Sequence, residues 1–365
     1  MNRLLVPMLL FFAGACASEV SDYPFTTQEV ASFDEPWAMA FLPDGRLLVT
    51  EKQGRLFVVS ADDGSSAPVR GVPAVDYGGQ GGLGDVALHP DFAENGRIYL
   101  SYAEAGDNGT RGAAVASATL SLVPGSEALS DVEVIWRQDP KVSGRGHYGH
   151  RLLFSDDGYL FISSGDRQKF DPAQDMDGNL GKIVRLNDDG TVPDDNPFAG
   201  RGGVTAQIWS LGHRNPLGIA FDAEGQLWNH EMGPRGGDEL NRVLKGKNYG
   251  YPIVSNGRHY DGRDIPDHDT RPEFEAPKVW WTPVISPGGF MIYSGKMFPE
   301  WQGDGFIAGL SSEALVRIEF DGENAREAER FPMGKRIRAV VQGPDGAIWL
   351  LEDKKGGRLL KLTPR

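Results

Sequence analysis

Short apolar segments alternate with tight polar turns along most of the chain. A typical copy reads WAMAFLPDGRLLVTE at 37–51, where an Asp-Gly turn separates two runs of apolar, β-branched and aromatic residues. Two such runs around a turn residue predict a β-hairpin. The pattern recurs at 86–102, 151–166, 218–231, 290–310 and 339–353. The expected turn glycines are Gly45, Gly96, Gly158, Gly225, Gly305 and Gly346.

A further apolar run follows most of these hairpins, at 54–59, 181–187, 314–320 and 357–362. Repeats of roughly 40–80 residues that are built from hairpins are typical of β-propeller blades. One blade cannot bury its faces alone, so repeats of this kind need their neighbours. The sequence therefore predicts an all-β fold, a six-bladed β-propeller with four-stranded antiparallel blades. A pair of packed β-sheets is the alternative, and the even distribution of the copies favours the propeller.

Three long segments separate the hairpins, at 105–145, 166–207 and 232–288. We expect them to form long loops at the channel mouth. Loops of this length in a compact domain are usually functional.

The first 17 residues predict a secretory signal peptide. Arg3 precedes an apolar run at 4–12, and small residues follow. The run is too short to span a bilayer, and no later stretch is long enough. Cys16 follows Ala13-Gly14-Ala15, which resembles a bacterial lipoprotein cleavage site with Ala in the place of the usual Leu. We expect export to the periplasm and a single propeller domain over 18–365. Lipid anchoring through Cys16 and plain cleavage both stay open.

Composition narrows the class of protein. The chain carries 37 Lys and Arg against 51 Asp and Glu, a net charge of −14, which argues against a nucleic-acid-binding face. Its 40% hydrophobic and 10% aromatic content is typical of a globular core. A single Cys excludes an internal disulfide framework and a thiolate zinc cluster.

Two glycine-rich segments between the hairpins carry candidate polar groups. Gln80 lies among glycines at 77–85, where the backbone can approach a ligand closely. His147 lies in a glycine-rich turn before a predicted strand, and a positioned His is a natural general base near neutral pH. His150 is a second candidate three residues later. Either His can instead be structural.

Arginines and acidic residues complete the candidate set. Arg214 and Asn215 precede a proline, and such an Arg either binds an anion or holds a loop. Arg336 and Arg338 alternate along a predicted strand, so they share one face and need either protein carboxylates or a polyanionic ligand. The segment 230–252 gathers Asp238, Glu239 and Asn241 beside Gly-Pro and Gly-Gly. Hard oxygen ligands of this kind suit calcium, although an acidic surface turn is the simpler alternative.

Together, these residues come from different blades and lie on loops. Their convergence predicts a site at the channel mouth that binds an acidic molecule together with a divalent cation, with a base beside it.

The ordered motifs resemble the soluble quinoprotein glucose/sorbosone dehydrogenase family, the aldose sugar dehydrogenases that depend on pyrroloquinoline quinone (PQQ). The resemblance covers essentially the whole mature chain and includes QGGLGDVALHPDF, HYGHRL, GHRNPLG, EMGPRGGDELN, KNYGYP and RIR in family order. It implies a six-bladed propeller, PQQ and Ca²⁺ as cofactors, and oxidation of an aldose at C1 to the lactone. The sequence does not identify the electron acceptor; a periplasmic cytochrome and a membrane quinone are the two candidates.

The resemblance also implies residue roles. His147 would be the base that takes the proton of the anomeric hydroxyl as hydride passes to the quinone, and Arg214 would polarise the quinone. The side chains implied to bind PQQ are Gln80, Arg214, Asn215, Arg336 and Arg338. The carbonyls of Gly233 and Pro234 would hold calcium under PQQ, and Glu239 with Tyr249 would belong to a second, structural calcium site.

The chain departs from the family pattern at three places. Ser311 stands where the family often has Lys, and Gly146 stands where Asp or Asn commonly precedes the catalytic His. The Trp that packs on PQQ in some members falls near Trp280, Trp281 or Thr282. Two other classes stay open, a calcium-dependent propeller lactonase and a non-catalytic exported binding module. Quinone reduction after addition of PQQ and Ca²⁺ distinguishes all three.

Overall fold

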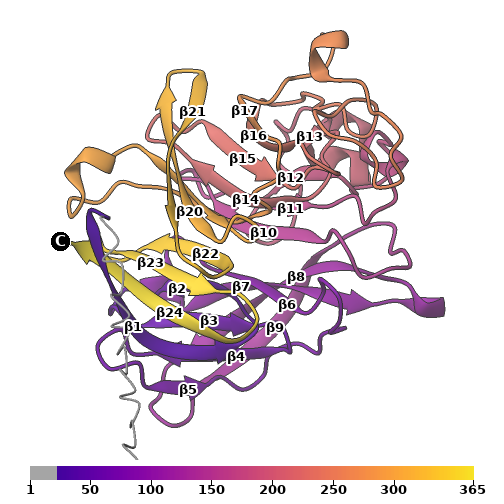
Figure 1. Ribbon diagram of the computed structural model, residues 1–365. Helices are drawn as coiled ribbons and strands as arrows, with labels where there is room; N and C mark the ends of the chain where they lie inside the picture. Colours follow the sequence, from indigo (N-terminus) through magenta and orange to yellow (C-terminus); the bar gives the residue numbers. More distant parts are fainter. Residues whose placement is uncertain (1–22) are drawn as a thin grey trace, which may run out of the picture.

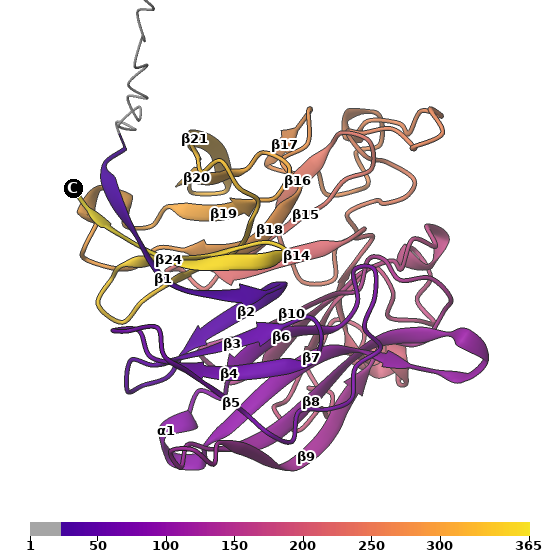
Figure 2. The same cartoon turned by 60° about the horizontal axis from the view of Figure 1, so that its bottom comes forward.

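Six four-stranded sheets form a ring in the computed structural model, which describes residues 23–365 (Figures 1 and 2). The predictions on the signal peptide, Cys16 and the boundary at residue 18 lie outside the described residues. Five sheets follow the chain in order, and β-strands pair antiparallel within each. The six-bladed all-β fold predicted from the sequence is therefore confirmed.

The first three blades span residues 36–211. The first contains β2 (Pro36–Phe41), β3 (Leu47–Glu51), β4 (Arg55–Val59) and β5 (Ser66–Pro68). The second contains β6 (Leu83–Leu88), β7 (Arg97–Ala105), β8 (Arg111–Ser121) and β9 (Ala128–Arg137). The third contains β10 (Gly149–Phe154), β11 (Leu160–Ser164), β12 (Lys182–Leu186) and β13 (Ile208–Leu211).

The other three blades use the rest of the chain and its first strand. The fourth contains β14 (Pro216–Phe221), β15 (Leu227–Glu231), β16 (Asp238–Arg242) and β17 (Val279–Trp281). The fifth contains β18 (Pro287–Ile292), β19 (Gly305–Gly309), β20 (Ala314–Asp321) and β21 (Asn324–Pro332). The sixth contains β22 (Ile337–Gln342), β23 (Ile348–Glu352), β24 (Lys355–Pro364) and β1 (Phe25–Asp34). The helical turns are α1 (Phe92–Asn95), η1 (Asp107–Gly109), η2 (Asp171–Ala173), η3 (Ala199–Arg201), η4 (Val204–Gln207), η5 (His268–Thr270) and η6 (Pro299–Trp301).

The six predicted hairpins are the first two strands of each blade, but one turn glycine is wrong. Gly305 is the first residue of β19 and the loop before it bends at Gly303, whose φ is +89°. A positive φ of this size favours glycine because it has no Cβ.

The three predicted insertions are only partly loops. Residues 105–145 contain the long strands β8 and β9, so the prediction of a loop there is wrong. β9 lacks a clear apolar pattern because it is an outer strand with a run of solvent-exposed residues. Within 232–288 the structure has β16 and β17, and the true insertion is 243–278, which forms the loops at the upper right of Figure 1.

The first strand of each blade lies on the inside of the ring. Each of these strands, β2, β6, β10, β14, β18 and β22, contacts the next, and β22 contacts β2 again. Loops that precede them therefore meet around one channel. Within the described residues no helix is long and apolar enough to cross a membrane.

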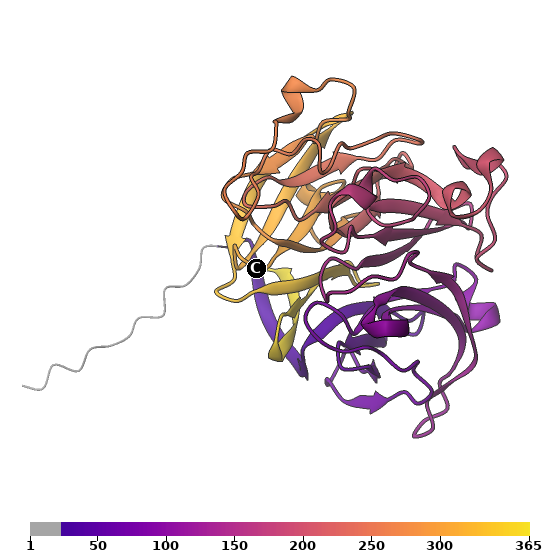
Figure 3. The same ribbon diagram turned by 90° about the vertical axis from the view of Figure 1, so that its right-hand side faces the viewer.

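The two ends of the chain close the ring. The indigo strand β1 lies beside the yellow strand β24 in Figure 3, and Phe25 is in register with Pro364. The Phe25 side chain is 4% exposed and packs against Phe331 and Trp301 of the fifth blade, at ring distances of 5.2 and 6.2 Å. The first strand thus joins two blades.

Phe25→Ala should lower the free energy of unfolding by about 3–5 kcal/mol, because it leaves a cavity between the last two blades. Urea denaturation of the variant measures this loss. Thr26→Ala, on the exposed side of the same strand, should change it by less than about 1 kcal/mol. Equal, small effects of both substitutions would contradict a closing role for β1.

Candidate functional site

The predicted site residues lie at one end of the channel, because each precedes or begins an inner strand. Gln80 precedes β6, His147 precedes β10, Arg214 and Asn215 precede β14, and Arg336 precedes β22. These segments line two adjacent cavities, which the neighbours His147 and Tyr148 connect.

The arginine cavity has a volume of about 150 Å³. Its lining includes Trp37, Lys52, Gln80, His150, Arg336 and Arg338. The histidine cavity has a volume of about 230 Å³. It is lined by His147, Gln168, Phe170, Arg214, Pro234, His259, Tyr260, Asp261 and Arg263.

His147 is held by a carboxylate that the sequence analysis missed. Its Nδ1 lies 2.6 Å from Oδ1 of Asp166, which is fully buried, and its backbone N–H donates to Gln80 Oε1 at 2.7 Å. An ionised carboxylate only accepts, so Nδ1 carries the proton and Nε2 presents its lone pair. Nε2 has no hydrogen-bond partner among the described residues. The pair has the geometry of an oriented general base.

Burial lowers the pKa of His147, and the hydrogen bond to Asp166 opposes that shift. A lowered pKa keeps the imidazole neutral, and therefore basic, near neutral pH. His147 itself has a positive φ of 49°, and Arg167 and Gln168 in the facing loop also have positive φ. Clusters of such backbone angles are typical of functional sites.

His150 is the more tightly packed of the two histidines. It is 2% exposed, its Nδ1 lies 2.9 Å from Ser101 Oγ, and its ring stacks on Trp37 at 4.9 Å. Burial lowers its pKa to about 3. Its Nδ1 meets a hydroxyl, whereas Nδ1 of His147 meets a buried carboxylate, so His147 has the better arrangement for a general base.

Arg214 and Asn215 are both buried and both have an unused donor. Arg214 Nη1 donates to the carbonyls of Met232 and Gly233 at 2.8 and 2.6 Å, while its Nε has no partner. Asn215 Oδ1 accepts from Gly149 N–H, and its buried Nδ2 has no partner. Buried donors without partners are costly and mark places where a ligand would bind.

Arg336 and Arg338 lie together, as their spacing predicts. Both bind Asp353, Arg336 at 2.8 Å through Nε and Arg338 at 2.9 Å through Nη2. The sequence left protein carboxylates and a ligand as alternatives. One carboxylate for two guanidinium groups leaves an excess positive charge. Lys52, which the sequence analysis missed, also lines this cavity, but it is paired with Glu35 at 3.5 Å. The cavity therefore suits an anion.

The predicted carbonyl ligands lie beside Arg214. Gly233 O accepts from Arg214, and its N–H donates to Asp238 Oδ1 at 2.8 Å. A carbonyl oxygen has two lone pairs, so a cation at Gly233 would share this atom with Arg214. Pro234 lines the histidine cavity. Burial raises the pKa of Asp238 to about 6. Its second oxygen accepts from Ser286 N–H, so Asp238 links the loop at Gly233 to the segment before β18.

Glu239 lies opposite Glu231 in the register of β16 and β15. Burial raises the pKa of Glu239 well above its usual value, and the charge of Glu231 adds to the shift. Nearby, the buried Oδ1 of Asn241 has no partner. Like charges directly opposite each other are destabilising, but both oxygens of Glu231 already have partners in His213, Asn241 and Arg214 N–H. A cation here would therefore bind chiefly to Glu239 and to Asn241 Oδ1.

Tyr249 fits that second site only through its backbone. Its hydroxyl donates to Arg242 O and accepts from Leu244 N–H, which occupies the group. Within residues 23–365 no three His, Cys, Asp or Glu side chains are grouped closely enough to hold a metal ion. Carbonyl and amide oxygens would have to complete either calcium site.

The departures from the family pattern have local explanations in two cases. A Cβ on Gly146 would lie 2.4 Å from Gln168 Oε1, so the Gln168 amide occupies the space of the missing side chain. Ser311 Oγ donates to Val284 O. Trp280 is 56% exposed and Trp281 donates to Glu327, and neither lines the two cavities.

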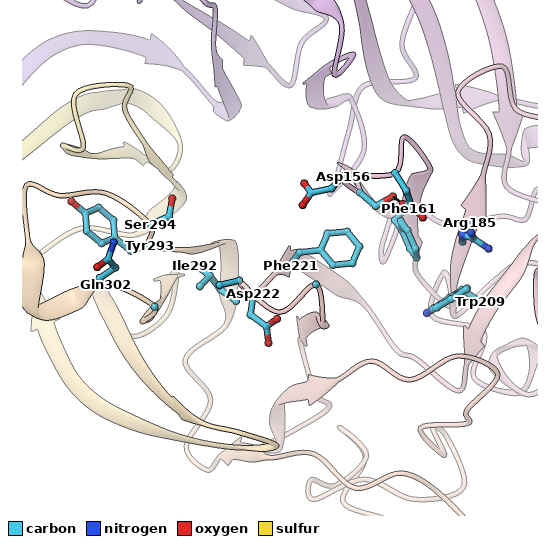
Figure 4. A pocket seen from close by; sticks show the side chains of 15 residues that line it. Asp156, Phe161, Arg185, Trp209, Phe221, Asp222, Ile292, Tyr293, Ser294 and Gln302 are labelled. Atoms are coloured by element: carbon cyan, nitrogen blue, oxygen red, sulfur yellow. Dashed lines mark hydrogen bonds between the residues drawn. The ribbon is translucent and has the colours of Figure 1, made fainter.

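A larger cavity of about 850 Å³ lies at the other end of the inner strands. It is lined by hairpin turns of the third, fourth and fifth blades, and Figure 4 shows Asp156, Phe161, Phe221 and Trp209 among its side chains. None of the predicted site residues lines it. Size alone therefore does not locate the chemistry.

Comparisons with known proteins give one consistent result. A family model described as Glucose / Sorbosone dehydrogenase matches residues 33–361. Aldose sugar dehydrogenase YliI of Escherichia coli is 42% identical, and the match covers 99% of this chain and 98% of that protein.

Solved structures agree with the sequence matches. The apo-form of the soluble aldose sugar dehydrogenase from Escherichia coli superposes with a TM-score of 0.88 at 42% identity, covering 93% of this chain and all of that one. The PQQ-bound form of an aldose sugar dehydrogenase from Streptomyces coelicolor superposes with a TM-score of 0.79 at 28% identity, covering 93% and 98%.

Proposed function

The chain belongs to the glucose/sorbosone dehydrogenase family, and on that premise we propose that it oxidises an aldose at C1 to the lactone, with PQQ and Ca²⁺ bound. The observation that carries the proposal is the His147–Asp166 pair, because His147 has an unpartnered Nε2 and lines a cavity together with Arg214. The PQQ-bound relative supports the choice of cofactor.

The residues present fit PQQ, which carries three carboxylates. Arg336 and Arg338 would bind carboxylates, because Asp353 neutralises only one of the two. Arg214 Nε and Asn215 Nδ2 are the orphan donors available to oxygens of the ring system, and Gln80 lies at the edge of the arginine cavity. When bound, the quinone supplies the acceptor for the hydride of C1.

His147 supplies the proton chemistry. Asp166 holds the imidazole so that Nε2 takes the proton of the anomeric hydroxyl as C1 loses hydride. Asp166 then stabilises the imidazolium, which is the usual task of a carboxylate behind a catalytic His. Arg214 directs positive charge toward the place where negative charge develops, an electrostatic contribution to rate. Calcium on the carbonyls of Gly233 and Pro234 would add to that charge.

The test is a titration of the calcium-loaded protein with PQQ, followed by a panel of aldoses with an artificial electron acceptor. We expect a saturable quinone spectrum that an aldose bleaches. Failure to bind PQQ at micromolar concentration would overturn the proposal in favour of a binding module. The reduced cofactor must pass its electrons to a further acceptor. Because we expect the protein to be exported, we propose a periplasmic cytochrome or a membrane quinone as that acceptor.

Calcium should stabilise the protein through the Glu231–Glu239 pair as well as at the carbonyls. A ligand at 100 times its dissociation constant stabilises the folded state by about 2.7 kcal/mol. We expect the melting temperature to rise with calcium, and Glu239→Gln to lose most of the rise, because it removes one carboxylate. Glu224→Gln, in an exposed turn, is the control and should keep it. A full calcium response in Glu239→Gln would exclude the second site.

A further inference from the structure

A further cavity, of about 500 Å³, is lined by the insertion at 243–278, at the upper right of Figure 1, and by Trp280 of β17. It shares no lining residue with the arginine or the histidine cavity, so it is separate from the proposed chemistry. The side chains that give this insertion cavity its character are Asp267, His268, Asp269, Phe274 and Trp280.

His268 lines the insertion cavity without a hydrogen bond to its ring. It is 5% exposed, and neither Nδ1 nor Nε2 has a partner among the described residues. Glu239 Oε1 lies 4.0 Å from Nε2, which is too far for a hydrogen bond. Burial lowers the pKa of His268, so the ring is neutral at neutral pH and keeps one lone pair. Calcium takes oxygen ligands, so a calcium ion at Glu239 would leave this lone pair free.

Two carboxylates beside His268 have no cation to balance them. Asp267 and Asp269 are exposed, line the same cavity, and form no ion pair with any described residue. Their charges act on the imidazole, because they oppose the effect of burial on the pKa of His268. Arg271, the next basic residue of the chain, pairs with Glu273 at 2.6 Å instead. The cavity therefore carries uncompensated negative charge, which attracts a cation.

Two aromatic side chains also line the insertion cavity. Trp280 lies on the edge strand β17 and is 56% exposed, whereas its neighbour Trp281 is buried and donates to Glu327. Phe274 is half-buried, and the guanidinium carbon of Arg271 lies 5.3 Å from its ring centre. Trp280 has no cation over its ring among the described residues. Of the aromatic side chains Trp attracts a cation most strongly, so this ring favours the same kind of ligand as the carboxylates.

We propose that the insertion cavity binds an aliphatic amine in its charged form, an ammonium group on a chain of several methylene groups. An ammonium group has three donors and no acceptor, which suits two carboxylates and an imidazole lone pair. The methylene chain would pack on Trp280, whose face also attracts the charge. A metal ion fits less well, because no three His, Cys, Asp or Glu side chains within residues 23–365 are grouped closely enough to hold one. The inference is independent of PQQ and of the sugar.

The test is a calorimetric titration of the calcium-loaded protein with 1-pentylamine and with 1,5-diaminopentane at neutral pH, where both amines are charged. The ligand control is 1-pentanol, which has the same chain without the charge. We expect saturable binding of the amines and none of the alcohol. Binding should weaken at higher salt, because salt screens the attraction between exposed charges.

Trp280→Ala should weaken binding of the amines by about two- to fivefold, the range of one exposed cation–π contact, and Trp280→Phe should keep most of the affinity. The double variant Asp267→Asn with Asp269→Asn should weaken binding by about two- to thirtyfold, the range of two exposed charge pairs, and remove most of its salt dependence. Val123→Ala and Asp62→Asn, at exposed positions of other blades, are the matched controls and should bind as the unchanged protein does.

No saturable binding of either amine would overturn the site. Unchanged affinity in both Trp280→Ala and the double variant would place the amine elsewhere and overturn it too. Glucose is titrated in parallel, because aromatic and carboxylate side chains also bind sugars. Binding of glucose that Trp280→Ala abolishes, without binding of the amines, would replace the amine site by a sugar site. The melting temperature of each variant should stay close to that of the unchanged protein, because the substituted side chains are exposed.

Discussion

His147→Gln should lower the turnover of an aldose by about 10²–10⁴-fold and leave PQQ binding unchanged. The magnitude is that of a lost general base. The cofactor should still bind because the His147 side chain is not one of its proposed ligands. Gln80, Arg336 and Arg338 line the adjacent arginine cavity, and Arg214 and Asn215 lie on the loop before β14. The measurements are steady-state kinetics and a PQQ titration of the variant.

A role of His147 as the base also predicts how kcat/KM depends on pH. Burial lowers the pKa of His147 below 6.5, so the basic form dominates at neutral pH. In the unchanged protein kcat/KM should therefore fall only as the pH drops through that lowered value, and this acid limb should vanish in His147→Gln. His89→Gln is the control. His89 follows β6 and so lies at the opposite end of the inner strands from His147, and this variant should keep both the rate and the acid limb of the pH profile. Unchanged turnover in His147→Gln would exclude His147 as the base.

Asp166→Asn should lower turnover by a comparable amount, on the order of 10³–10⁴-fold, although the substituted residue does not touch the sugar. An amide at this position can donate to Nδ1, which moves the imidazole proton to Nε2 and removes the base. The shape of the side chain is kept, and the remaining oxygen, in the place of Oδ2, can still accept from Phe170 N–H. The amide nitrogen takes the place of Oδ1, so the direct loss is one hydrogen bond, from Gln168 N–H.

The tautomer of His147 distinguishes this explanation from local unfolding. Nitrogen chemical shifts of the imidazole should report a proton on Nδ1 in the unchanged protein and on Nε2 in Asp166→Asn. The melting temperature should change little. Full turnover in Asp166→Asn, or a proton that stays on Nδ1 while turnover falls, would show that Asp166 does not act through the tautomer.

The blades could be predicted from the sequence because a hairpin is a local structure. Its two apolar runs and its turn residue lie within about 15 residues, so no long-range contact is needed to recognise it. The outer strands carry less of this pattern, and β9 was mistaken for part of a loop because solvent faces several of its residues in succession. Gly303 was missed because both it and Gly305 lie between the two apolar runs.

Asp166 could have been predicted from the hairpin itself. Gly149 pairs with Ser164 in the register of β10 and β11, so the residues two positions beyond this pair, His147 and Asp166, must meet. The turn before a hairpin and the residue after it are always brought together in this way. Recognising the acid as the last residue of the repeat would have identified the partner of the base.

The same geometry joins the arginines to their carboxylate. Ile337 pairs with Glu352 across β22 and β23, which places Arg336 beside Asp353 just outside the pair. By contrast, Phe170 and Tyr260, which line the histidine cavity, could not be predicted, because no repeat relates their loops. Only the folded ring brings the two insertions to one opening.

The closure of the sixth blade by β1 and β24 has a consequence for synthesis. Thr26 and Thr363 bond to each other across 337 residues, so the first strand has no partner until the last residues have emerged. Until then, β1 and the outer edge of β23 carry unpaired backbone groups, which are prone to pair with other chains. Contacts of such sequence separation also slow folding. A chain that stops a dozen residues early would lack β24 and leave β1 without a partner, which exposes the backbone of β1 to proteolysis.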